Sequence, residues 1–531
     1  MKFFNSQPEI SSQKTTECDT SDDDNKPIQH VSDLIGSWGP FQRQLFIILI
    51  FVYAISPFSN TSLMYYLTRS DFWCQAADGI DIASELNSCD IKSCDKWFHN
   101  TTRKNLVTEW DLICDRSYLK SAAQSSYALG YLVSGLLIGT ISDKYGRKIA
   151  VISSTLVEIV CFFILATAKS IEVFIVTRFI SGIGGYGRYL GTLLILVETV
   201  GPELRGRIVV VYDWIWHIGI YVMILVTYYV ENFRHLYLMV ACYQVASLLL
   251  IIFKMPESLR WQLATGRDEL AHRKLSSYMS INSPEVEAKS QAKLEKLRKF
   301  LAQQHAQASR SKGMIDIWKV PRLLGTCIAL YFFWFAISFM GNGLSYFQLD
   351  LSGNFHLNMA IIQLSNIAAT AFLNWRIEKY DRKMLLLVSS LGIVIFLFAS
   401  APFLLDHDVI YLRNMIFILA QFALSVAFMI QYVYTAELFP TTMRHLALGS
   451  FSVPSRIGSI AAPFVSLLSA YLDKRFILVG FGSIGLIAAV VTIFLPETRG
   501  REMPDTVDEL IRMTREKSSK NNSTDNSMDQ P

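Results

Sequence analysis

Five ionisable residues lie inside long apolar stretches of this 531-residue chain, where a charge is costly and usually functional. They are Glu158, Arg188, Asp213, His217 and Arg456. Arg188 could be neutralised by Glu158 or Asp213, so a structural ion pair and a substrate contact both stay open. For His217, a buried neutral imidazole with one hydrogen bond is favoured over a proton-coupling role. Arg456, near the middle of its stretch, must face an aqueous cavity or a buried carboxylate.

Aromatic residues accompany these charges and could stack on a substrate or face an ammonium group. They make up 13% of the chain. Trp216 precedes His217, the stretch 331–339 reads YFFWFAISF, and Tyr432 lies on a later apolar stretch. Rings on a membrane helix more often pack in the core or face lipid, so we expect only some of them to line a cavity.

The apolar stretches that position these residues are long enough to cross a bilayer. The chain is 51% hydrophobic and 18% charged, whereas about a quarter of a soluble protein is charged. A soluble enzyme and a nucleic-acid-binding protein are therefore excluded, and the lipid bilayer is the expected surrounding. Because a helix needs roughly 20 apolar residues to span the hydrocarbon, we predict twelve spans in two sets of six. The spans are 45–67, 121–142, 149–169, 173–200, 209–230 and 234–254, then 323–347, 357–378, 384–404, 410–436, 446–471 and 475–495.

Basic residues in alternate loops predict the orientation. Segment 254–322 holds 14 Lys or Arg against 7 Asp or Glu, and such loops face the cytoplasm. We therefore expect a multi-pass protein of the plasma membrane with both termini inside. The expected organisation is a cytoplasmic tail (1–40), a six-helix half (41–254) with an extracellular loop (68–120), a cytoplasmic loop (255–322), a second six-helix half (323–495) and a cytoplasmic tail (496–531).

The loop 68–120 carries the features of an oxidising compartment. Four of the eight cysteines, Cys74, Cys89, Cys94 and Cys114, fall within it and suggest two disulfides of undetermined pairing. The sequon at Asn100 predicts a glycan, whereas the sequon at Asn60 lies so close to the first span that its use is doubtful. No His or Cys cluster has metal-ligand spacing, so we expect neither a metal nor a cofactor.

The two halves share motifs at a shift of 235 to 240 residues. DKYGRK (143–148) recurs as EKYDRK (378–383). The other repeated landmarks pair Arg178 with Arg413, Glu198 and Arg205 with Glu437 and Arg444, and Glu257 with Glu497. Two duplicated halves with a substrate site between them at mid-membrane are typical of a secondary transporter that works by alternating access.

The repeated motifs predict gating rather than catalysis. Gly139 would allow two spans to pack closely, Asp143 lies at a helix end, and Gly146 would form a tight turn before Arg147. Glu198 and Glu437 could each pair with an arginine of a neighbouring loop. Pairs made in one conformation and broken in the other would form a latch between two states, although a role in topology alone stays open.

GTISDKYGRK (139–148) resembles the loop signature of the major facilitator superfamily, and Arg178 with Gly182 and Gly184 resembles its fourth-helix motif. More narrowly, the chain is similar to the organic cation and anion transporters of the solute carriers. The stretches that carry this similarity are 36–46, 108–119, 256–261 (PESLRW, with Glu257 and Arg260), 436–449 and 496–501. The resemblance implies an all-α fold of twelve membrane helices that moves amphipathic organic ions through an aromatic-lined cavity. Asp381 departs from the loop signature of the family, which has glycine at this position.

The resemblance also implies which residues bind substrate. Trp334 and Phe339 match cavity-lining positions, and Asn366 replaces an acidic residue that is frequent in the family. Arg456 matches the arginine of anion carriers, and it would attract carboxylates or sulfonates. With Trp216 and Tyr432, these residues favour a transporter of small organic anions or zwitterions, with a counter-ion or exchange substrate left open. The alternatives are an organic cation transporter of the same family and, with less support, a sugar-type facilitator or a non-transporting sensor.

Overall fold

The computed structural model describes residues 31–267 and 321–499 except for short connections, and four residues between 295 and 300. The connections outside the description are 37, 69–70, 76–80, 83–88, 90–95, 100–103, 348–353, 378, 404–409, 440–443 and 469–471. Within the described residues, twelve helices are long and apolar enough to cross a membrane. Each of the twelve predicted spans overlaps one of them.

The first half consists of six long spans and four short elements. The spans are α2 (Pro40–Tyr53) continued by α3 (Ser56–Thr61) and η3 (Ser62–Tyr66), then α5 (Tyr118–Tyr145), α6 (Arg147–Thr167), α7 (Ile171–Thr199), α8 (Pro202–Tyr229) and α9 (Phe233–Lys254). The short elements are α1 (Ser32–Ile35), α4 (Leu106–Glu109), η4 (Cys114–Arg116) and α10 (Leu259–Ala264). Proline begins α2 and α8 at the first helical position, where its missing N–H costs nothing.

The second half repeats this arrangement. Its spans are α14 (Pro321–Phe347), α15 (Phe355–Arg376), α16 (Arg382–Ser400), α17 (Ile410–Leu438), α18 (Arg444–Ala461) continued by α19 (Phe464–Leu468), and α20 (Lys474–Phe494). Asn354 caps α15 and Asp473 caps α20 through side-chain oxygens that accept backbone N–H groups. Large apolar side chains such as Phe253, Phe494 and Ile395 are exposed on the outer helix faces. Exposed apolar surface of this extent fits a multi-pass membrane protein.

Helices α5 and α7 approach each other through glycine. A Cβ at Gly182 would collide with the carbonyl oxygen of Tyr127, and one at Gly130 with that of Phe179. The prediction that Gly139 provides a close contact is wrong in this conformation, because a Cβ there would meet no atom within 4 Å. Close packing instead occurs about two turns earlier on α5.

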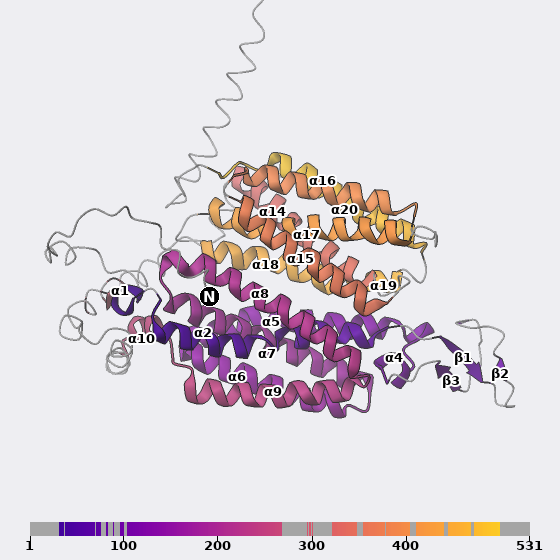
Figure 1. Cartoon of the computed structure of the whole chain (residues 1–531), viewed down its shortest axis with the longest axis horizontal. Coiled ribbons are helices and arrows are strands. Elements are labelled where there is room, and N and C mark those ends of the chain that lie inside the picture. The colour runs from indigo at the N-terminus through magenta and orange to yellow at the C-terminus, as the bar shows by residue number, and fades with distance from the viewer. Residues whose placement is uncertain are drawn as a thin grey trace, which may run out of the picture.

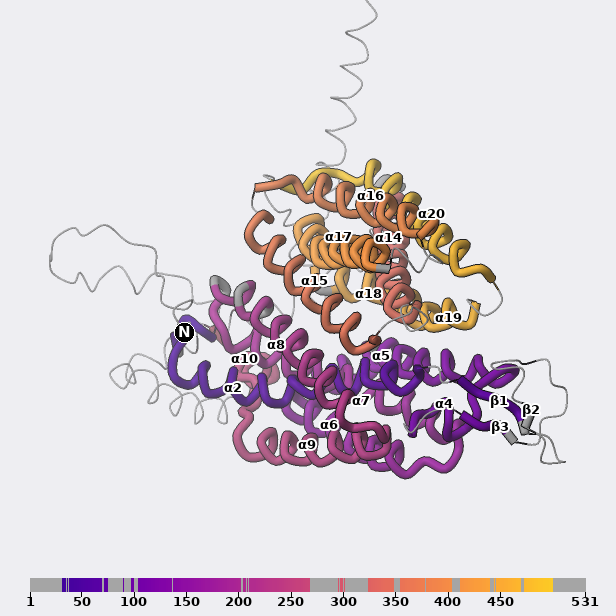
Figure 2. The backbone as a smooth tube through the Cα atoms, turned by 45° about the vertical axis from the view of Figure 1, so that its right-hand side comes forward, coloured from indigo at the N-terminus to yellow at the C-terminus, as the bar shows by residue number. Residues whose placement is uncertain are grey.

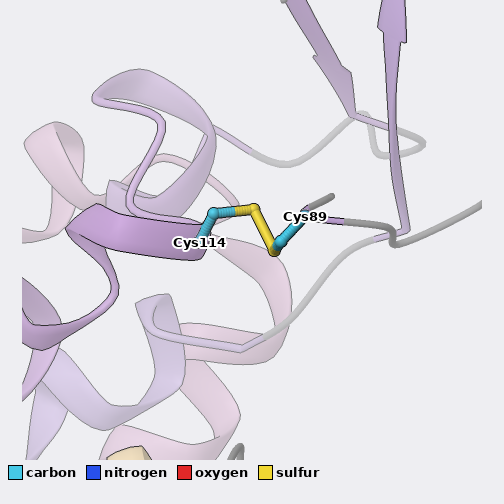
Figure 3. The surroundings of a disulfide bond; sticks show 2 residues. All are labelled: Cys89 and Cys114. Carbon is cyan, nitrogen blue, oxygen red and sulfur yellow. A yellow bond between two sulfur atoms is a disulfide. The ribbon is translucent and has the colours of Figure 1, made fainter. Parts of the chain in front are cut away.

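A small sheet and a disulfide follow the first span. Strands β1 (Phe72–Gln75), β2 (Asp81–Ile82) and β3 (Lys96–His99) form an antiparallel sheet in the order β2-β1-β3. A disulfide joins Cys89 to Cys114 (Figure 3), and Cys74 is also disulfide-bonded. Cys94 and the sequon residue Asn100 lie outside the described residues. Asn60 lies on α3, inside the first span.

The two halves form separate bundles that meet along a limited surface (Figures 1 and 2). Helix α5 packs against α18 and α19, and α8 packs against α15. Ser121 donates a hydrogen bond to the Pro463 carbonyl (2.9 Å) and Ser125 to that of Ile460 (2.6 Å). The ring of Tyr65 contacts that of Phe355 near the end that carries the strands.

The contacts between the two halves are concentrated toward one end of the molecule. Among the described residues, the hydrogen bonds and ring contacts that join them extend from the middle of the helices to the end that carries β1–β3. The opposite end of the molecule carries α1 and α10 (Figure 1). The described conformation is therefore closed at the strand end.

Candidate substrate site and gating networks

Arg456 lies in the middle of α18, at the surface where the two halves meet. Its guanidinium carbon is 5.2 Å from the ring centre of Tyr131 on α5 and 5.3 Å from that of Tyr186 on α7. The side chain is partly exposed, and no carboxylate among the described residues pairs with it. Its charge is thus stabilised by ring faces of the opposite half rather than by a counter-ion.

Further tyrosines extend this aromatic region across the first half. Tyr53 on α2 stacks on Tyr212 of α8 with ring centres 3.9 Å apart, and Tyr189 lies 5.7 Å from Tyr53. Trp216, one of the predicted substrate contacts, is partly exposed, with its ring 6.3 Å from Tyr53. Aromatic rings of α2, α7 and α8 in the first half thus extend the aromatic region that surrounds the guanidinium of Arg456 in the second half.

The second half contributes Tyr432, a predicted substrate contact on α17. It is 38% exposed, and its ring stands edge-on to Trp334 at 4.4 Å. Trp334 itself is fully buried and donates a hydrogen bond to Thr435 (3.2 Å). In this conformation Trp334 therefore supports Tyr432 from behind and is not exposed between the halves, contrary to the prediction. Phe339 is partly buried and packs against the cores of both halves.

The pairing of Arg188 is resolved in favour of a structural ion pair. Its Nε donates to Glu158 at 2.6 Å, and Nη1 donates to the Val52 carbonyl (2.8 Å) and to Ser56 (3.1 Å). Both charged side chains are almost completely buried. A pair with three helices around it holds α2, α6 and α7 together and leaves no exposed charge for a substrate.

His217 and Asp213 form a second polar group on α8. His217 Nε2 lies 3.4 Å from Asp213 Oδ2, and its Nδ1 contacts the side-chain amide of Gln363 on α15 of the other half. Asn366, the remaining predicted substrate contact, donates to Gln363 Oε1 (3.2 Å) and accepts from Ser425 (2.7 Å). Nothing in the spacing of these residues along the chain indicated that Gln363 would connect Asn366 to His217.

The first gating network joins the loop between α5 and α6 to neighbouring helix ends. Arg147 pairs with Asp143 (2.8 Å) and with Glu198 (3.3 Å). Ser258 donates to Glu198, and Glu257 accepts the backbone N–H of Lys148 at 3.0 Å. Gly146 has a φ of 114°, and a Cβ there would collide with the Glu257 carboxylate. The predicted turn at Gly146 is thus present, and only glycine fits it.

The second half contains an equivalent network. Arg382 donates to both oxygens of Glu437 (3.1 and 3.2 Å), and Thr498 donates to the same carboxylate at 2.7 Å. Glu497 accepts the backbone N–H groups of Arg382 and Lys383, each at 3.0 Å. Sequence reasoning missed Arg382, although the 235-residue shift that relates the two loops places it opposite Arg147.

The other motif arginines occupy separate places. Arg178 is buried, donates to the Ser59 carbonyl (2.8 Å) and lies over the ring of Tyr127. Arg413, its equivalent, is also buried. Arg205 donates to the Val200 carbonyl (3.3 Å) and has Glu198, Arg260 and Asp33 as electrostatic neighbours. Arg444 begins α18. Glu198 and Glu437 each pair with an arginine of a neighbouring loop, Arg147 and Arg382.

Comparison with known proteins identifies the family. Residues 82–507 match the model of the family described as "Sugar (and other) transporter". The chain belongs to this transporter family. It is therefore a membrane transporter of the major facilitator fold rather than an enzyme.

Curated relatives and solved structures agree with this assignment. The transporter is 28% identical to pig (Sus scrofa) organic anion transporter 3 over 78% of its own chain and 76% of the relative. It is 25% identical to human organic cation/carnitine transporter 2, covering 91% and 94% of the two chains. The partially occluded inward-open xylose transporter XylE from E. coli superposes with a TM-score of 0.62 at 16% identity, covering 87% and 99%. This last similarity shows the fold alone.

Proposed function

We propose that this transporter carries small organic anions, zwitterions included, across the plasma membrane by alternating access. The observation that supports an anionic substrate is the position of the Arg456 guanidinium between the two halves. A guanidinium at mid-membrane without a carboxylate partner is costly, by roughly 2.5–3.5 kcal/mol even on the lenient insertion scale. A carboxylate or sulfonate would neutralise it through two parallel hydrogen bonds. The tyrosine rings around it would stack on the apolar part of such a substrate.

The proposed orientation gives the described conformation a place in the transport cycle. Basic residues in the loops assign the end with α1 and α10 to the cytoplasm, together with both chain termini. Since the halves are in contact from mid-helix to the strand end, the site would be open to the cytoplasm and closed to the outside. To complete the cycle, the two halves would close around the substrate at the α10 end and separate from each other at the strand end.

An organic cation is the second candidate substrate, and the carboxylate of Asp213 favours it. The carboxylate is 32% exposed and has a histidine, not an arginine or lysine, as its described ion-pair partner. Tyrosine faces beside it could also hold an ammonium group. The names of the relatives include both anion and cation transporters.

Uptake of four labelled compounds by cells that express the full chain separates the candidates. We expect uptake of toluenesulfonate, whose charge does not change with pH, and of phenylalanine betaine. Uptake of tetraethylammonium alone would favour an organic cation transporter. Uptake of glucose alone would favour a sugar facilitator. Uptake of none of the four compounds would favour a sensor that does not transport.

The variant Arg456→Asp tests the proposed contact. Loss of a charge-assisted hydrogen bond costs about 1.5–3 kcal/mol, so toluenesulfonate uptake per surface molecule should fall at least about tenfold. Arg376→Asp at the end of α15, where the guanidinium lies over Trp375, is the matched control and should retain uptake. Unchanged uptake in Arg456→Asp at normal surface abundance would contradict the anion contact.

A further inference from the structure

A continuous chain of polar side chains crosses from one half of the transporter to the other at mid-membrane. Ser425 on α17 donates to Asn366 Oδ1 (2.7 Å), and Asn366 Nδ2 donates to Gln363 Oε1 (3.2 Å). Gln363 Nε2 contacts His217 Nδ1, and His217 Nε2 lies 3.4 Å from Asp213 Oδ2. His217 and Gln363 are both buried. The chain is therefore a buried polar connection between the two halves.

The contacts of Gln363 are compatible with one tautomer of His217. Gln363 uses its oxygen to accept from Asn366, so its nitrogen donates toward His217 Nδ1. A ring nitrogen that accepts carries no proton, and the single proton of a neutral imidazole then lies on Nε2, toward Asp213. The described contacts at the strand end are thus compatible with a neutral histidine beside the carboxylate of Asp213.

The same chain can accept a proton without losing a hydrogen bond. With a proton on Nδ1, His217 would donate to Gln363 Oε1, and the turned amide of Gln363 would donate to Asn366 Oδ1. The turned amide of Asn366 would donate to Ser425, whose hydroxyl has a second acceptor in the Gln421 carbonyl at 2.9 Å. One proton is added from water, no covalent bond of the side chains breaks, and each donor from His217 Nδ1 to Ser425 keeps an acceptor.

The surrounding charges determine when that proton is needed. Asp213 and Arg456 both interact electrostatically with Tyr432, and Asp213 also with Tyr53 of α2. Helix α15 contributes Gln363 but no carboxylate. Once a bound organic anion has neutralised Arg456, the carboxylate of Asp213 is left as an uncompensated negative charge at the site. Burying an uncompensated charge is costly, and a protonated His217 would restore neutrality.

We propose that His217, together with Asp213, binds a proton that enters the cell with each organic anion. The proposal rests on the function proposed above. Protonation turns the contact between His217 and Gln363 into a charge-assisted hydrogen bond, which is stronger than a neutral one. It thereby favours closure at the strand end. Because Asp213 remains 32% exposed in the described conformation, the proton can leave on the cytoplasmic side once the anion has gone.

The test is toluenesulfonate uptake by cells that express the full chain, measured at external pH values from about 7.5 to about 5.5. Uptake should rise severalfold as the external pH falls across this range. His217→Gln and Asp213→Asn should abolish the rise. His235→Gln, at an exposed position near the start of α9, is the matched control and should keep it. A cytoplasmic pH indicator should report acidification on addition of toluenesulfonate, and His217→Gln should eliminate that signal.

The outcomes separate this proposal from the proposed function. Uptake that is present but independent of pH, or equally dependent on pH in His217→Gln, overturns the proton site and leaves the anion transporter intact. A dependence abolished only by His356→Gln would place the proton at the ring contacts with Tyr65 and Tyr228 instead and would also overturn it. Absence of uptake at every pH overturns both. If His217→Gln does not reach the surface, Asp213→Asn decides the question.

Discussion

Glu437→Gln tests whether the gating networks bias the conformational equilibrium. The substitution keeps the shape of the side chain and removes its charge. Glu437 accepts from Arg382 at 3.1 and 3.2 Å and from Thr498 at 2.7 Å, and both members of the ion pair are less than one-fifth exposed. A hydrogen bond to a charged group contributes about 1.5–3 kcal/mol. If the pair exists only in the described conformation, that conformation should lose about 10- to 150-fold in population.

The measurement is the rate at which a cysteine introduced at Tyr432 reacts with a maleimide from the cytoplasmic side. We expect the rate to fall by the same factor, because Tyr432 is partly exposed between the halves. Glu198→Gln should have the same effect through the equivalent network. Asp381→Asn removes the exposed pair with Arg499 (3.2 Å) and is the matched control, since exposed pairs contribute only about 0–1 kcal/mol. Lower surface abundance with an unchanged labelling rate would refute the latch, because the pair would then exist in both conformations.

Three further predictions concern single positions. Asp143→Asn removes one of the two carboxylates at Arg147, and we expect a lower maximal uptake rate with little change in half-saturation, so an unchanged rate at normal surface abundance would count against gating. Gly182→Val should abolish surface expression, because its Cβ would collide with the backbone of α5; Gly206→Val, where a Cβ meets no atom within 4 Å, is the control. Asn100→Gln should remove most of the gel-mobility change that an N-glycan-cleaving enzyme produces, and a parent protein with no such change would contradict the extracellular assignment of its loop.

The fold could be predicted because hydrocarbon imposes a simple requirement on sequence. An apolar stretch of about 20 residues must be a helix in a bilayer, since each backbone polar group has to be satisfied within it. The repeat at 235 to 240 residues then grouped the helices into halves. The pairing of Glu198 was harder to predict, because Arg147 and Arg205 are both within reach of a helix end. Only the spatial arrangement of the loop brings Arg147 within 3.3 Å of Glu198.

Positions whose roles depend on side-chain direction were predicted less well. Gly139 and Gly130 are both small residues on α5, yet only Gly130 faces the backbone of α7. Trp334 and Tyr432 are both aromatic, yet burial leaves only Tyr432 exposed between the halves. Helical period alone does not say which face of a membrane helix is buried when all faces are apolar.

Arg188 and Arg456 show what distinguishes a structural charge from a candidate binding charge. Both lie near the middle of a membrane helix, and sequence offered each a carboxylate or a cavity as partner. Arg188 is enclosed by Glu158, a carbonyl and a hydroxyl, so its charge joins helices of one half. The guanidinium of Arg456 lies over two ring faces, and both rings belong to the opposite half. A charge without a counter-ion, on a surface that must separate and close in each cycle, is neutralised most simply by the molecule that is carried.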